Sequence, residues 1–382
     1  MSVALRPDTP KRTRQISGAT GLSPPVGHDD CASGSYGDTT ILITDRMTQP
    51  RLGFSVPRAR DRRFVLFGLE GNETSWRGLG LFAFVFFGSL VLAGAALPVI
   101  YWAVQWVATE LDSGLARSLL RNRVDKFFDF LRWVPVLVGL PWIMWLCHCW
   151  SFSALGLART GHIRFALTWG FAAGVVLIAL VAAGQMTFGT AVIRPRAELS
   201  PLQVLKWVAI SFAIAIIVST IEEIVFRGLI LRLFYTSTRY PWLALTLSAA
   251  FFAYTHFKIP PSEWTKVGSV HWDTGWLAAY WMLIGISVEF ELNRFIALWL
   301  LGMVLGTLML RTGSLWPGIG LHGGLVFGML LYHDLLHDFG PIAGFWGSTA
   351  LIDGWAVVFA LALLFFVALA KLPFSWTNFS PG

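Results

Sequence analysis

The sequence predicts an all-α fold, a polytopic bundle of about eight or nine transmembrane helices. Hydrophobic residues make up 55% of the 382 residues and charged residues only 13%, which is far from the balance of soluble proteins. The mean hydropathy is +0.62. Apolar stretches of roughly 20 residues, the length that crosses a bilayer core, recur from residue 79 onward. The 19 tryptophans fit the interfacial belts of membrane proteins.

Residues 1–75 differ from the rest of the chain because they are rich in Pro, Gly, Ser, Thr, Asp and Arg without a sustained apolar period. Such a segment buries too little apolar surface to offset its ordering entropy, so we expect a disordered tail. No basic region followed directly by an apolar one is present, so the tail is not predicted to be a cleavable signal peptide. Met47 is an alternative start of translation, which would leave residues 1–46 untranslated.

The apolar stretches divide the remaining chain into three parts. We expect N-terminal transmembrane helices over 76–200, a core with the candidate catalytic residues over 201–335, and a loop with a C-terminal transmembrane helix over 336–382. The predicted spans are Leu79–Ala108, Trp133–Trp150, Phe165–Thr187, Trp207–Leu231, Trp242–Phe257, Trp276–Phe290, Phe295–Leu310, Trp316–Tyr332 and Ile352–Ala370. The stretches at 242–257 and 276–290 are short, so we expect one to be tilted, re-entrant or broken. Glu110–Arg132 alternates charged and apolar residues and predicts an amphipathic helix at the membrane interface.

The formal net charge of +7 raises the question of a nucleic-acid partner. The basic residues are scattered beside the apolar spans and form no stripe with aromatic platforms, which argues against nucleic acid and for membrane lipid. Arginines in the tail favour a cytoplasmic N-terminus, but the basic loop between Arg117 and Arg132 would then be outside, so the rule for orientation conflicts with itself. We expect an integral protein of a bacterial inner or cell membrane.

Two adjacent carboxylates and an arginine interrupt one apolar span, in the sequence Ile221-Glu222-Glu223-Ile224-Val225-Phe226-Arg227-Gly228. A charge at that depth is expensive unless it is paired or faces a polar cavity, so the cluster predicts a functional site. Glu223 and Arg227 stand at i and i+4 on one helix face and predict an ion pair, whereas Glu222 faces elsewhere. Glu222 is then available as a general base. The alternative is that both glutamates only hold the bundle together.

Isolated histidines in two later apolar spans favour chemistry over a purely structural role. His256 ends one span and His322 lies in a glycine-rich one. A single membrane histidine is usually an interhelical hydrogen-bond partner, but two of them with a carboxylate suggest a site that activates water or binds a divalent metal such as zinc. The glycines around His322 permit the close approach of a substrate or a neighbouring helix.

Other metal-ligand patterns are weaker. Cys147-His148-Cys149 has no second Cys/His cluster to complete a tetrahedral site. His333 and His337 have the i, i+4 spacing of helix ligands, but we interpret them as part of a solvated loop.

Three motifs in register resemble the CPBP family of intramembrane proteases, which includes the type II CAAX prenyl endopeptidases. They are Glu-Glu-x-x-Phe-Arg-Gly from Glu222, Phe252-x-x-x-His256, and Gly-Ser-Leu-Trp-Pro ahead of His322. The resemblance covers roughly Pro201 to Leu331. It implies that Glu222 is the general base on a catalytic water, that His256 holds that water or a metal, that His322 stabilises the oxyanion or completes the site, and that Glu223 and Arg227 are the accompanying pair.

The chain departs from the family pattern at Val326. The family usually has Asn or a similar polar residue four positions after the last histidine, where an oxyanion-hole donor can lie. The sequence therefore predicts a membrane-embedded, CAAX protease-like endopeptidase, either glutamate-dependent or metal-dependent, that cuts membrane-associated or lipidated substrates. The alternatives are a non-catalytic scaffold that binds a peptide or partner protein in the same cavity, and a transporter, which the lack of internal repeats disfavours.

Overall fold

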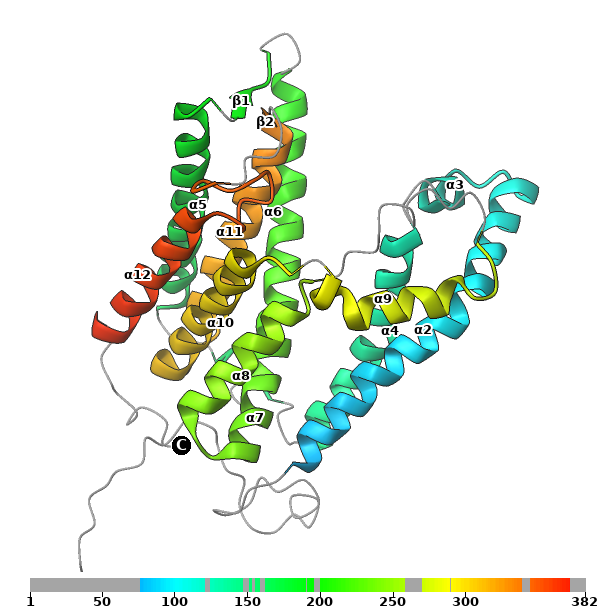
Figure 1. Cartoon of the computed structure of the whole chain (residues 1–382), viewed down its shortest axis with the longest axis horizontal. Coiled ribbons are helices and arrows are strands. Elements are labelled where there is room, and N and C mark those ends of the chain that lie inside the picture. The colour runs from blue at the N-terminus through cyan, green and yellow to red at the C-terminus, as the bar shows by residue number, and fades with distance from the viewer. Residues whose placement is uncertain are drawn as a thin grey trace, which may run out of the picture. The chain divides into compact units, whose positions relative to one another are not determined.

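The computed structural model describes residues 76–120, 124–146, 151–152, 155–158, 162–189, 191–195, 200–257, 270–288, 290–338 and 344–371 (Figure 1). All of them belong to the second of two units into which the chain divides, Gln49–Gly382. The predicted disordered tail 1–75 and the Cys147-His148-Cys149 cluster lie outside the described residues.

The predicted all-α membrane fold is confirmed, and a helix coincides with each of the predicted spans. The helices are α2 (Arg77–Glu110), α3 (Gly114–Leu120), α4 (Val124–Leu146), α5 (Ile163–Thr187), α6 (Pro201–Glu223), η2 (Ile224–Ile230), α7 (Leu231–Thr238), α8 (Pro241–Tyr254), α9 (Thr274–Val288), α10 (Leu292–Thr312), α11 (Trp316–Leu335) and α12 (Trp355–Lys371). Five helical stretches in the described part are long and apolar enough to cross a membrane, and 241–254 and 355–370 are shorter apolar helices. The number of spans stays a prediction.

The segment Glu110–Arg132 is not the single amphipathic helix that its pattern predicts. α2 ends at Glu110, and Asp112 turns the chain aside with a φ of 50°. The Ser113 hydroxyl then accepts a hydrogen bond from the Ala116 amide at the start of α3. A third piece, the first turns of α4, completes the segment. Its interfacial position stays a prediction.

Two short strands follow α5 and α11, where the sequence predicts only loops. β1 (Ala191–Ile193) pairs antiparallel with β2 (Leu336–Asp338), so the predicted loop after residue 335 begins as a strand. The backbone groups that leave the two helices satisfy each other in this ladder. Arg194 adds a hydrogen bond from Nε to the Asp334 carbonyl at 2.8 Å and so ties the end of α11 to β1.

The helix that carries the glutamates is longer and less regular than predicted. α6 continues without a break through η2 into α7, so the predicted span Trp207–Leu231 becomes one stretch from Pro201 to Thr238. η2 is a π-helix, in which the Leu231 amide bonds to the Phe226 carbonyl five residues earlier. Such π-turns are rare and occur frequently at functional sites. This one begins directly after Glu223.

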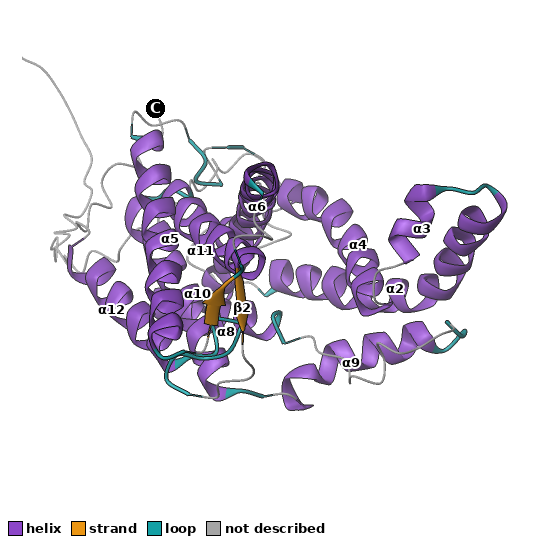
Figure 2. Ribbon diagram, turned by 90° about the horizontal axis from the view of Figure 1, so that it is seen from above, coloured by secondary structure: helices purple, strands orange, loops and turns teal. Residues whose placement is uncertain are grey.

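Glycines bring α5 and α11 into backbone contact (Figure 2). A Cβ on Gly170 would lie 2.6 Å from the Pro317 carbonyl oxygen, and one on Gly324 would overlap the carbonyl oxygen of Phe171. Small residues drive such close helix pairs in membranes, where van der Waals packing replaces the hydrophobic effect. The prediction that glycines near His322 admit a neighbouring helix is confirmed, and that helix is α5.

We expect Gly324→Ala to destabilise the protein, because the added methyl overlaps the α5 backbone and overpacking costs about 1–3 kcal/mol. Gly88→Ala is the matched control, since a Cβ at Gly88 meets nothing within 4 Å. Thermal unfolding in detergent measures both. Equal stability of the two variants would contradict the backbone contact.

Candidate active site

Glu223 is the fully buried centre of the polar cluster at the end of α6. Its Oε1 accepts a hydrogen bond from Arg227 Nη1 at 2.7 Å and another from His322 Nδ1 at 3.0 Å. The ion pair expected from the i, i+4 spacing is therefore present. One carboxylate oxygen joins α6, η2 and α11.

Arg227 is held by aromatic rings as well as by Glu223. Its guanidinium carbon lies 4.5 Å from the centroid of the Phe252 ring and 5.8 Å from that of Phe226. The face of an aromatic ring attracts a cation, most strongly when both are removed from water. The buried arginine is thus stabilised by one anion and by aromatic rings from η2 and α8.

His256 lies in the turn just beyond the end of α8. Its Nδ1 lies 2.8 Å from the Phe252 carbonyl, and because a carbonyl only accepts, this nitrogen carries the proton. In the neutral imidazole, Nε2 then presents a lone pair. That nitrogen lies 3.9 Å from Glu222 Oε2.

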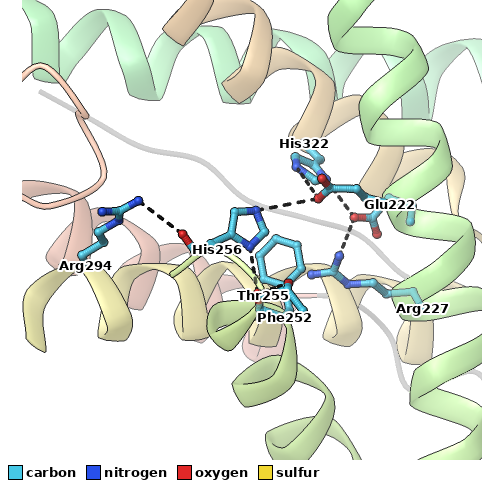
Figure 3. Close-up of polar contacts among 8 residues, drawn as sticks. Glu222, Arg227, Phe252, Thr255, His256, Arg294 and His322 are labelled. Carbon is cyan, nitrogen blue, oxygen red and sulfur yellow. Dashed lines mark hydrogen bonds and ion pairs between the residues drawn. The ribbon is translucent and has the colours of Figure 1, made fainter. Parts of the chain in front are cut away.

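His322 reaches the same carboxylate oxygen from α11. Its Nδ1 donates to Glu223, and its Nε2 lies 3.7 Å from Glu222 Oε2. The ring is 4% exposed, so the apolar spans enclose it. Figure 3 shows both imidazoles directed at Glu222. Each ring nitrogen lies within one bridging water of Glu222, which is the reach that general-base chemistry needs.

Oε2 is buried without a direct hydrogen bond in both glutamates, but Glu223 accepts two hydrogen bonds at its Oε1. The Glu222 side chain is 26% exposed, whereas that of Glu223 is 0% exposed. With both histidines neutral, Glu222 Oε2 and the two Nε2 atoms are all hydrogen-bond acceptors. A donor such as water, or a proton on one ring, is required between them.

An apolar cavity of about 180 Å³ opens beside these three side chains. Phe252, Leu301, Leu325 and Met329 are among the residues that line it. Val326, where the family pattern has a polar residue, also faces the cavity. The position one turn beyond His322 therefore points at the site but offers no hydrogen-bond donor.

The donor set was tested as a metal site. Two imidazole nitrogens and one carboxylate oxygen are groups that zinc accepts. Their separations of 3.7 and 3.9 Å exceed the ~3.4 Å between ligands of a tetrahedral zinc with bonds of ~2.0–2.1 Å. Over the ranges that the structure describes, no group of three or more His, Cys, Asp and Glu side chains is arranged to hold a metal ion. We therefore derive no step that depends on one.

Arg294 on α10 was not identified from the sequence. Its Nη2 donates to the His256 carbonyl at 3.4 Å, and its guanidinium carbon lies 5.2 Å from the Phe257 ring centroid. It therefore ties the turn that carries His256 to α10. The sequence signal was an arginine immediately before a predicted span, but a cation in that place is normally an interfacial flank.

The fold and the site together define an all-α membrane protein with a glutamate and two histidines beside an apolar cavity. Comparison with protein families agrees with this class. Residues 204–328 match the family model described as type II CAAX prenyl endopeptidase Rce1-like, which confirms the resemblance inferred from the motifs over this segment. The searches of curated proteins and of solved structures returned no match.

We expect Glu223→Gln to lower the free energy of unfolding by about 3–5 kcal/mol, because it leaves the buried Arg227 without its anion. Glu222→Gln is the matched control: it removes the neighbouring charge but breaks no direct hydrogen bond at Oε2. Folded yield and thermal unfolding of the purified variants are the measurements. Equal losses in the two would contradict the different roles of the glutamates.

Proposed function

We propose that this protein is a glutamate-dependent intramembrane endopeptidase in which Glu222 is the general base. The observation that carries the proposal is the convergence of Glu222 Oε2 with the Nε2 atoms of His322 and His256, at 3.7 and 3.9 Å, beside an apolar cavity. The family match supports the reaction class, because the matched family consists of endopeptidases.

A single water can lie between Glu222 and His256 within about 2.8 Å of both acceptors. Its two hydrogens then point at Glu222 Oε2 and His256 Nε2, which leaves an oxygen lone pair directed away from both. That lone pair attacks the carbonyl carbon of a peptide bond placed in the cavity. Glu222 takes the proton that the water loses.

The later steps of the reaction deal with the negative charge that attack creates and with the proton that Glu222 has taken. Attack places a negative charge on the former carbonyl oxygen, and a donor near that oxygen accelerates the reaction. His322 can donate to this oxygen only when its Nε2 carries a proton. The proton on its Nδ1 is hydrogen-bonded to Glu223 whether or not Nε2 is protonated. Glu222 then delivers its proton to the leaving nitrogen as the C–N bond breaks, which regenerates the carboxylate.

Glu223 and Arg227 act as positioning residues in this scheme. Glu223 orients the His322 ring and offsets positive charge on it, in the same way that a buried carboxylate orients a catalytic histidine in hydrolases. Arg227 holds the Glu223 carboxylate in place through the ion pair. We propose peptides of membrane-associated or lipidated proteins as substrates, with the bacterial cell membrane as the location.

We expect Glu222→Gln to abolish cleavage while the protein remains folded, because the amide keeps the shape of the side chain but cannot take the proton. A quenched-fluorescence peptide library measures cleavage by the wild type and by the variant. Thermal unfolding in the same detergent verifies folding. Wild-type rates in a folded Glu222→Gln protein would refute the role of Glu222 as base.

A non-catalytic scaffold is the second candidate, and Val326 is the observation that favours it. Val326 lines the cavity one turn beyond His322 and brings only methyl groups to the place where the family usually has a polar side chain. Loss of one oxyanion donor costs about 2.7–4 kcal/mol in activation free energy. A peptide can therefore bind in the same cavity without being cut at a useful rate.

We expect Val326→Asn to raise turnover by up to about 10²-fold if the protein is a slow protease, because an amide there can donate to the oxyanion. The gain is smaller if nothing else holds the new side chain in place. Val326→Leu, which has nearly the shape of the Asn side chain but no hydrogen-bond donor, is the matched control, and turnover on the peptide library is the measurement. Absence of Glu222-dependent cleavage in both wild type and Val326→Asn would favour the scaffold.

A further inference from the structure

Part of the apolar wall of the cavity is built by helices outside the matched family domain. Leu177 and Ile178 come from α5, and Ile352, Val357 and Leu361 come from α12 and the loop before it. All five positions fall outside residues 204–328. The matched domain thus provides Glu222, His256 and His322 at the polar end of the cavity. Residues outside the domain form part of the apolar lining next to them.

This wall is fixed in place by hydrogen bonds. Gln185 at the end of α5 donates to the carbonyls of Trp346, Gly347 and Ser348, at 3.0–3.3 Å. The Tyr332 hydroxyl of α11 donates to Gln185 Oε1 at 2.6 Å. α5, α11 and the loop before α12 are therefore held as one unit. A wall with this support can discriminate between side chains of different size.

The volume of the cavity limits what can occupy it. An apolar protein cavity of about 150 Å³ binds benzene, and the present cavity is about 180 Å³. It therefore has room for one apolar side chain up to about the size of phenylalanine. The wall offers no polar partner for a peptide backbone, whose burial without hydrogen bonds is unfavourable. The backbone must then lie at the polar end, with only a side chain entering the apolar part.

We propose that Ile352, Val357 and Leu361, together with α5, form a specificity pocket that takes one apolar side chain next to the scissile bond. The inference rests on the proposed function, because it assumes that a peptide bond is placed at Glu222. Leu361 is the best test position, since its side chain is 2% exposed and faces the cavity. Leu363 on the same helix is 66% exposed and provides the control.

The test uses a peptide library in which each position is varied in turn among Ala, Val, Leu, Phe and Trp. Mass spectrometry of the products identifies the residues on both sides of each cut. The wild type should accept residues up to Phe and discriminate against Trp. Leu361→Ala should raise the ratio of rates for Trp over Val by about tenfold or more, the scale that a few methylenes are worth in an apolar pocket. Val357→Met should lower the rate for Phe relative to Ala, and Leu363→Ala should leave the profile unchanged.

A binding arm separates this pocket from the proteolytic activity. The same library is equilibrated with the Glu222→Gln protein, alone and combined with Leu361→Ala, and the bound peptides are identified. A shift toward larger residues in the Leu361→Ala background supports the pocket even if the wild type cuts nothing, in which case only the proteolytic function fails. The proposed pocket would be refuted if Leu361→Ala and Val357→Met left the preference for side-chain size unchanged, or if Leu363→Ala changed it equally. Either result would leave any observed cleavage unexplained by this pocket but still valid.

Discussion

The site depends on one interaction, the acceptance of two hydrogen bonds by a single oxygen of Glu223. Arg227 and His322 both donate to Oε1, and all three side chains are buried in a bundle of apolar helices. A charge in that setting is stable only with partners of opposite sign or with aligned dipoles. The ion pair within the helix offsets the free-energy cost of burying the Glu223 carboxylate. This carboxylate then fixes the orientation of the His322 ring through a hydrogen bond. The orientation of the candidate catalytic histidine is thus a consequence of how the charge is neutralised.

Packing between helices delivers His322 to that anion. Gly324 on α11 meets the backbone of α5, and Gly323 faces Ser219 of α6, where a Cβ would lie 3.1 Å from the Ser219 hydroxyl oxygen. α11 is therefore confined between α5 and α6 at the level of the glutamates. Any larger residue at these glycines would move α11, and the distance from His322 to Glu222 would change with it. The small residues therefore help to set the geometry of the candidate site even though they bear no functional group.

Local patterns in the sequence were enough to predict much of the fold and the polar end of the site. Apolar stretches marked the helices, and the i, i+4 spacing marked the pair of Glu223 with Arg227, because each depends only on neighbours along one helix. The meeting of His256 and His322 at Glu222 followed from the motifs, since no local rule brings separate helices together. The π-turn of η2 was not predictable, because no residue pattern in Ile224–Ile230 distinguishes a π-turn from an α-helical turn. The contact of Arg294 with the turn that carries His256, and the place of Val357 and Leu361 of α12 in the cavity wall, were not predicted for a related reason. Both depend on contacts between segments that are distant in the sequence.

The distribution of polarity in the cavity bears on how an enzyme can hold water inside a membrane protein. A buried water needs about two to four polar partners, and an apolar cavity of this size stays dry. In the present cavity those polar partners lie at the end formed by Glu222, His256 and His322. Val326 and the lining residues of α12 bring only carbon atoms to the rest of the cavity. A water that enters is therefore held next to the proposed base and disfavoured elsewhere. In this view the apolar lining does more than receive a side chain, because it confines the nucleophile to the place where Glu222 can take its proton.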